Sequence, residues 1–161
     1  MANTGYRSPY QAWPSARNPT LSLSSQFPKS IGITHSRGLG HQPYIAMTFD
    51  DGPHASNTPR LLDILRQRNI KATFYVIGKN VDNYPHLTRR IVAEGHEIGN
   101  HTYTHRNLKK LSDAQVLSEM ARARVSIVNA TGVQPRTMRP PYGAIYQRQR
   151  ELIMNRFGYP T

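Results

Sequence analysis

Short apolar runs alternate along this chain with longer segments of helical periodicity, and this alternation restricts the possible folds more than any other feature of the sequence. The apolar runs predict strands over 44–49, 71–77 and from 97, with a last extended piece over 137–139. The periodic segments predict helices over 57–69, 84–94, 112–131 and 145–157. Strands that alternate with helices are typical of a parallel α/β sheet or barrel.

Several helix ends carry recognisable signals. Ser112 is expected to cap the start of the longest helix through its hydroxyl group. Gly95, Gly132 and Gly158 each follow a periodic segment and offer the left-handed conformation that closes a helix. These positions support the helix boundaries that the periodicity predicts.

The chain divides into two parts of different composition. Residues 1–42 are rich in Ser, Pro, Gly, Asn and Arg without sustained periodicity, which predicts a flexible N-terminal segment. Residues 43–161 carry the alternating pattern and are expected to form the domain. A chain of 161 residues is long enough for one domain with a real core.

The chain is strongly basic. It has 21 Lys and Arg against 9 Asp and Glu, a formal charge of +12, which favours anionic partners. The basic residues occur singly and in pairs rather than in runs, and no nucleic-acid motif is present, so a solvated basic surface is expected and nucleic-acid binding is not. The absence of cysteine excludes thiolate metal sites.

No segment has the length or apolarity of a membrane span, and the N-terminus lacks the apolar core of a secretory signal. The sequence therefore predicts neither a transmembrane helix nor a visible signal peptide.

Polar clusters follow three of the predicted strands. Asp50 and Asp51 follow the first, the segment 101–105 follows the third, and 139–142 follows the fourth. Because the carboxyl ends of parallel strands meet at one edge of a sheet, these clusters are expected to form one site.

The first of these clusters pairs two aspartates, and the second pairs two histidines. His101 and His105 are four residues apart, a spacing that brings both rings to one face of a helix or tight turn. With one carboxylate they would form a two-histidine, one-carboxylate set that suits Zn²⁺ and similar ions. One aspartate would then bind the ion and its neighbour would take a proton from water. The alternatives are a chance histidine pair and an ordinary Asp-Asp-Gly-Pro turn.

Three segments resemble, in order and approximate spacing, the first three motifs of the NodB-type polysaccharide deacetylases (carbohydrate esterase family 4). They are Thr48–Pro53 (TFDDGP), His101–His105 (HTYTH) and Arg139–Gly143 (RPPYG). The resemblance covers about 43–161. It implies a distorted (β/α) barrel and metal-dependent removal of N-acetyl groups from N-acetylglucosamine polymers, namely chitin, chito-oligosaccharide or peptidoglycan.

The resemblance also assigns individual residues. It implies that Asp51, His101 and His105 bind a divalent metal ion, with Zn²⁺ expected and Co²⁺ or another divalent ion as the alternative. It makes Asp50 the catalytic base and Arg139 the residue that orients and tunes it.

The third motif and the histidine loop supply the remaining roles. Through the resemblance, the backbone N–H of Tyr142, next to Pro141, would bind the substrate and stabilise the oxyanion. Thr102 would support the histidine loop through a hydrogen bond.

The chain departs from the family pattern at its C-terminal end. The Asp- and Trp-rich fourth motif and the Leu-x-His fifth motif are not found, and the last histidine is His105. Four predicted strands are too few to close a barrel, so an incomplete barrel that lacks its C-terminal part is expected. The sequence therefore predicts weak or absent turnover.

Two alternatives and one expectation about location remain. One alternative is a catalytically impaired fragment that keeps a metal- and glycan-binding site. The other is a different metal-dependent hydrolase on a similar barrel. The resemblance suggests an extracellular or cell-envelope location.

Overall fold

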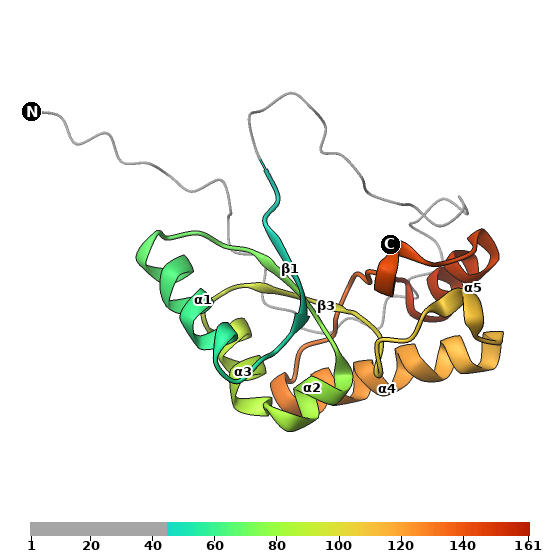
Figure 1. Cartoon of the computed structure of the whole chain (residues 1–161), viewed down its shortest axis with the longest axis horizontal. Coiled ribbons are helices and arrows are strands. Elements are labelled where there is room, and N and C mark those ends of the chain that lie inside the picture. The colour runs from blue at the N-terminus through green and yellow to red at the C-terminus, as the bar shows by residue number, and fades with distance from the viewer. Residues whose placement is uncertain (1–44) are drawn as a thin grey trace, which may run out of the picture. The chain divides into compact units, whose positions relative to one another are not determined.

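The computed structural model describes residues 45–161, and their centre is a three-stranded parallel sheet in the order β1-β2-β3 (Figure 1). The strands are β1 (Thr48–Gly52), β2 (Thr73–Val76) and β3 (Glu97–Asn100). Phe74 of β2 pairs with Phe49 on one side and with Ile98 on the other. A mixed α/β fold with a partial parallel sheet agrees with the predicted incomplete barrel. The predicted flexible segment 1–42 lies outside the described residues.

Helices connect the strands and cover the sheet. They are α1 (Asn57–Gln67), α2 (Gly78–Asn83), α3 (Pro85–Ala93), α4 (Asp113–Thr131) and α5 (Gln147–Phe157). Two short 3₁₀ turns lie at Leu108–Lys110 and Pro141–Gly143. The longest helix, α4, extends from α2 and α3 at its C-terminal end to α5 at its N-terminal end (Figure 1).

The apolar core has two parts, and α4 contributes to both. The first lies between the sheet and the helices and contains Leu62, Leu65, Phe74, Val76, Val81, Ile91, Ile98 and Ile127. The second lies between α4 and α5 and contains Leu108, Leu111, Val116, Met120, Met138, Ile145, Ile153 and Tyr159. Ile127 of α4 belongs to the first part, whereas Val116 and Met120 belong to the second. Because α4 packs in both, burial of its apolar side chains fixes its position relative to the sheet.

The predicted helix ends agree with the structure. Ser112 caps α4 in a reciprocal capping box with Gln115, whose side chain accepts from the Ser112 backbone N–H. Gly95, Gly132 and Gly158 have φ values of 78°, 72° and 70°, the left-handed conformation that ends a helix.

Two predicted elements differ from the structure. Strand β1 runs to Gly52, so the paired aspartates lie within its last residues rather than after it, because the pairing with β2 continues to that point. The extended piece at 137–139 is no full strand; Met138 forms a single parallel bridge to Asn100. Helix α2 was not predicted, because six residues that begin with glycine are too few to show helical periodicity.

None of the helices in the described part of the chain has both the length and the apolar character that crossing a bilayer requires.

Candidate active site

A cavity of about 580 Å³ lies at the carboxyl edge of the sheet, where the predicted polar clusters come together. It is lined by Asp50, Asp51, Tyr75, His101, His105, Thr137, Met138, Arg139, Pro140, Tyr142, Gly143, Arg150, Pro160 and Thr161. Pro141, which was predicted to lie in the substrate-binding segment, is buried and is not among these lining residues. All the other predicted catalytic, metal-binding and substrate-binding residues line the cavity.

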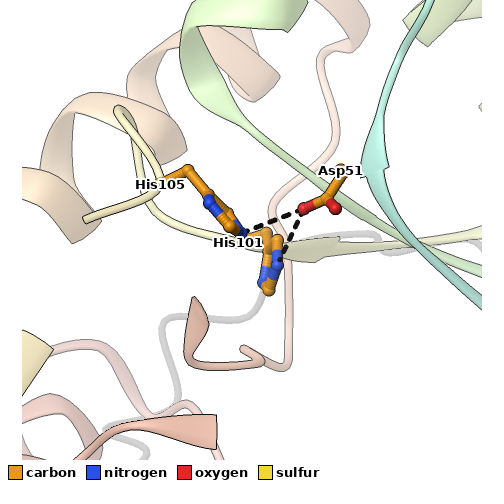
Figure 2. Close-up of side chains that lie close together, drawn as sticks. All are labelled: Asp51, His101 and His105. Carbon is orange, nitrogen blue, oxygen red and sulfur yellow. Dashed lines mark ion pairs between the residues drawn. The ribbon is translucent and has the colours of Figure 1, made fainter. Parts of the chain in front are cut away.

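Asp51, His101 and His105 point toward one another across this cavity (Figure 2). The Oδ1 atom of Asp51 lies 3.3 Å from Nε2 of His101 and 3.0 Å from Nε2 of His105. Ligand atoms about 2.0–2.1 Å from a tetrahedral Zn²⁺ lie roughly 3.3 Å from one another, so these separations suit a single ion.

The hydrogen bond of the buried His101 ring shows which nitrogen is free to bind an ion. Nδ1 of His101 lies 2.6 Å from the backbone carbonyl oxygen of Arg139. Since a carbonyl oxygen can only accept, Nδ1 carries the proton and Nε2 of the neutral ring presents a lone pair. That lone pair faces the Asp51 carboxylate, and two acceptors this close repel unless a proton or a cation lies between them. The residues therefore fit a metal ion.

Burial of His101 also favours the neutral form of its ring. Desolvation lowers the pKa of His101, although the Arg139 carbonyl and the nearby Asp50 carboxylate oppose the shift. A lowered pKa favours the neutral ring, and the neutral ring is the form that binds metal.

The loop between the two histidines is held from inside by polar contacts. The Thr102 hydroxyl accepts a hydrogen bond from the His105 N–H at 3.1 Å, a contact of the kind that loop support requires. Asn100 is fully buried; its amide accepts from the Thr102 N–H and donates to the carbonyl of Met120 in α4. The loop is thereby tied to α4.

Glu119 of α4 makes the tightest set of contacts with this loop. Its side-chain oxygens accept from the N–H groups of Tyr103 and Thr104, at 3.0 and 2.7 Å, and from the Thr104 hydroxyl at 2.8 Å. Glu119 is only 6% exposed, and burial of a carboxylate is costly unless such donors compensate it. The guanidinium of Arg122, one turn further along α4, lies 3.7 Å from the centre of the Tyr103 ring.

Sequence reasoning missed Glu119, although a signal was present. The apolar positions of α4 recur at Val116, Met120 and Ala123, and Glu119 lies on the same face, three residues after Val116. A charged residue on the core face of a helix points to a buried polar partner.

Asp50 is held by Arg139 on the other side of the cavity. Nη1 of Arg139 donates to Oδ1 of Asp50 at 2.7 Å and to the Thr48 hydroxyl at 2.9 Å. The guanidinium also lies over the Tyr75 ring, 4.2 Å from its centre. These contacts fix the orientation of the Asp50 carboxylate and leave its second oxygen, Oδ2, without a hydrogen bond among the described residues.

A local irregularity in β1 lets the two adjacent aspartates face different partners. The pairing register with β2 shifts between Phe49 and Gly52, and Asp51 has a φ of 67°. Asn80 of α2 holds this conformation, because its amide donates to the Asp51 carbonyl at 2.9 Å. Asp50 therefore reaches Arg139, whereas Asp51 reaches the histidines.

Several residues at this site have a strained backbone conformation with positive φ. Five described residues other than glycine have positive φ, and four of them belong to the predicted motifs. The four are Asp51, Thr102, His105 and Tyr142. Such conformations cost about 1–3 kcal/mol each and persist where the surrounding structure enforces them, which is common at functional sites.

The Tyr142 side chain lies over one side of the histidine pair. Its ring packs edge-on against His105 with 4.8 Å between ring centres, yet 73% of the residue is exposed. The backbone N–H of Tyr142 donates no hydrogen bond within the described residues. It is therefore open to an acceptor that enters the cavity.

Residues 38–161 match the family model described as polysaccharide deacetylase. A peptidoglycan-N-acetylglucosamine deacetylase of Bacillus cereus is 43% identical over 105 residues, which cover 65% of this chain and 38% of the relative. A chitooligosaccharide deacetylase of a Bradyrhizobium species is 49% identical over 100 residues, 62% of this chain and 46% of the relative. The chain thus spans less than half the length of these two curated relatives.

A solved structure shares the fold. A family 4 carbohydrate esterase from Streptomyces lividans, in complex with acetate, superimposes with a TM-score of 0.67 at 38% identity. The match covers 70% of this chain and 58% of that structure.

Proposed function

Because the chain belongs to the polysaccharide deacetylase family, we propose that its site hydrolyses N-acetyl groups of N-acetylglucosamine-containing polysaccharide. The observation that carries the proposal is that the two adjacent aspartates contact different partners. Asp51 faces two histidine nitrogens at 3.0 and 3.3 Å, while Asp50 is held apart from them by Arg139. The names of the relatives, which act on peptidoglycan and on chito-oligosaccharide, support the substrate class.

A divalent cation would be held by Asp51, His101 and His105, and we propose Zn²⁺. Two imidazoles with one carboxylate form a donor set that zinc accepts, and no other group of three such side chains converges among the described residues. The bound ion would supply Lewis acidity, which polarises the acetyl carbonyl and acidifies water.

Asp50 acts as the base in this proposal. Arg139 occupies Oδ1, so Oδ2 is the oxygen that takes a proton from the attacking water. The new bond joins the water oxygen to the acetyl carbon. The bond from that carbon to the sugar nitrogen then breaks, and the proton that Asp50 took passes to this nitrogen, so that acetate and the free amine are released.

Tyr142 provides a second contribution to the reaction. Its unengaged backbone N–H would donate to the carbonyl oxygen of the acetyl group as negative charge develops there. Its exposed ring lies beside the same space and offers a flat apolar surface to a sugar ring.

The test measures acetate release from N-acetylated chito-oligosaccharide and from peptidoglycan fragments by the zinc-loaded full chain. Asp50→Asn should remove the release, because the amide cannot take the proton. Glu97→Gln is the matched control; this exposed carboxylate lies at the opposite end of β3 and should leave release unchanged. Release that is equal in wild type and Asp50→Asn would overturn the proposal.

A further inference from the structure

Tyr75 of β2 contacts the guanidinium that holds the proposed base, and the proposed reaction assigns no role to this tyrosine. Phe74 and Val76 are buried in the core, so the alternation of side chains along a strand places Tyr75 on the opposite face of β2. There its side chain lines the active-site cavity. The centre of its ring lies 4.2 Å from Cζ of Arg139. The ring is therefore a wall of the cavity and a direct neighbour of the guanidinium.

The hydrogen bonds of the Arg139 side chain do not by themselves hold the guanidinium in one orientation. The same nitrogen, Nη1, donates to both the Thr48 hydroxyl and the Asp50 carboxylate. The side chains of Arg139 and Asp50 are 37% and 34% exposed, and an ion pair this exposed is a weak constraint on a long side chain. A guanidinium that is bound through one nitrogen can still turn about that nitrogen, so a second contact is needed to fix it.

The Tyr75 ring supplies this second contact. A guanidinium is attracted to the face of an aromatic ring, and its weak hydration lowers the cost of placing it there. With Nη1 bound to Asp50 and Cζ over the ring, the guanidinium keeps one orientation relative to the carboxylate. The Tyr75 hydroxyl forms no hydrogen bond with any other described residue, so the ring itself makes the contact.

Gly99 of β3 leaves the space that this ring occupies. It is the register partner of Tyr75 in the parallel sheet. A Cβ at Gly99 would lie 2.5 Å from both Cδ1 and Cε1 of the Tyr75 ring, whereas carbon atoms in contact are about 3.5–4.0 Å apart. Glycine in a strand interior weakens the strand and often marks such a close approach. The sheet therefore has room for the ring at the place where it contacts Arg139.

We propose that Tyr75 is a positioning residue, whose ring holds the Arg139 guanidinium in the orientation that keeps Asp50 in place to accept a proton. The inference rests on the proposed function and adds to it a residue outside the three motifs. Because the ring makes the contact and the hydroxyl does not, phenylalanine should replace Tyr75 and leucine should not.

The first experiment measures acetate release from N-acetylated chito-oligosaccharide by the zinc-loaded full chain, as wild type, Tyr75→Leu and Tyr75→Phe. Tyr75→Leu should lower kcat by about tenfold and leave KM within about twofold, because a displaced base affects the transition state more than substrate binding. Tyr75→Phe retains the ring and should keep kcat within about twofold of wild type. A loss as large in Tyr75→Phe as in Tyr75→Leu would mean that the hydroxyl acts directly, and would overturn the inference.

A double-mutant cycle separates positioning of Arg139 from a general disturbance of the structure. In the Arg139→Gln background, Tyr75→Leu should change acetate release by less than about twofold, because the group that it positions is already absent. A loss of the same size in both backgrounds would contradict the inference.

The matched control is Tyr146→Leu. The Tyr146 ring also lies near a cation, Nζ of Lys109 at 5.3 Å from the ring centre, but it does not line the active-site cavity. This variant should release acetate as wild type does. A loss in Tyr146→Leu equal to that in Tyr75→Leu would show that any such tyrosine has this effect, and would also contradict the inference.

Nuclear magnetic resonance of the metal-free proteins measures the same contact without any activity. The ring current of Tyr75 should shift the proton signal of the Arg139 Nε–H group, which is identified by its absence from Arg139→Gln. Tyr75→Phe should keep this shift and Tyr75→Leu should lose it. A signal that Tyr75→Leu leaves unchanged would overturn the inference even where acetate is released. A shift that is lost in Tyr75→Leu, with no acetate release by wild type, supports the positioning contact and contradicts the deacetylase.

Discussion

The backbone carbonyl of Arg139 accepts a hydrogen bond from Nδ1 of His101 at 2.6 Å. The side chain of the same Arg139 binds Asp50 on the other side of the cavity. One residue therefore fixes the tautomer of a proposed metal ligand through its main chain and the orientation of the proposed base through its guanidinium. A substitution of Arg139 removes the guanidinium contact with Asp50 but keeps the main-chain carbonyl that contacts His101.

Arg139→Gln should separate these two roles. The variant loses the contact with Asp50 but keeps its main-chain carbonyl, so the base is displaced while His101 stays in place. We expect acetate release to fall by about a hundredfold, because a misplaced catalytic group is costly, whereas the zinc Kd stays within about threefold. Paired kinetic and calorimetric measurements on one preparation check this, and a parallel loss of zinc affinity would contradict it.

Zinc binding should depend on the histidine pair. His101→Ala/His105→Ala removes two of the three proposed ligands and should weaken zinc binding by at least about a hundredfold. His86→Ala, an exposed histidine of α3, is the matched control and should bind zinc as wild type does. Calorimetry that finds the same affinity in all three proteins would exclude this metal site.

Glu119 should affect metal binding without touching the ion. Glu119→Gln retains the shape of the side chain and one accepting oxygen, but it removes the negative charge, and its NH₂ group cannot accept from the Thr104 hydroxyl as Oε1 does. The N–H groups of Tyr103 and Thr104 would then share a neutral amide oxygen, which accepts more weakly than a carboxylate. We expect zinc affinity to fall by about tenfold and the free energy of unfolding to fall by about 1–3 kcal/mol.

Ser118→Ala is the control for this variant, since Ser118 is the exposed neighbour of Glu119 in α4. It should change neither quantity. If Glu119→Gln lowers the free energy of unfolding and leaves zinc affinity intact, then Glu119 stabilises the fold but does not position the histidines.

His96 should make the fold less stable at acidic pH. Its Nδ1 accepts from the buried Ala72 N–H, and Nε2 is buried without a partner, so the neutral ring fits and the protonated ring does not. Burial lowers the pKa of His96 below 6.5, with a further contribution from Lys71. The unfolded chain therefore binds the proton first, and stability is lost as pH falls below about 6.5, by at most about 1.4 kcal/mol per pH unit.

Denaturant unfolding of metal-free protein between pH 7 and pH 5 measures this effect. His96→Asn keeps an acceptor near the Ala72 N–H but cannot titrate, so its stability should change less with pH than that of wild type. His101, whose pKa burial also lowers, contributes equally to both proteins and cancels in the comparison. Identical pH dependence in the two proteins would contradict the assignment to His96.

The position of the candidate site was predictable because the order and direction of the strands place its motifs at one edge of the sheet. In a parallel sheet the ends of β1 and β3 share one edge, so motifs at Asp50-Asp51 and at His101–His105 had to lie near each other. The contacts of Glu119 and Asn80 with this edge were not predictable. They depend on how α4 and α2 are placed, and that placement follows from packing of side chains distant in sequence.

Short helices were also not predictable from the sequence. Periodicity identified α4, which has 19 residues, but α2 has only 6 and begins at Gly78. A Cβ at Gly78 would lie 2.7 Å from the backbone of Ala123, so this glycine is required by close packing on α4. Such a requirement concerns a neighbour far along the chain and leaves no periodic signal.

The anchoring of α4 in both parts of the core has a consequence for local opening of the protein. The N–H groups of Tyr103 and Thr104 belong to an irregular loop, yet their acceptor is a buried carboxylate of α4. Because both parts of the core hold α4 in place, these hydrogen bonds break when the loop moves away from the helix, so deuterium exchange at the two N–H groups reports separation of the loop from α4. An ion bound by His101 and His105 would hold the loop and slow exchange at both groups.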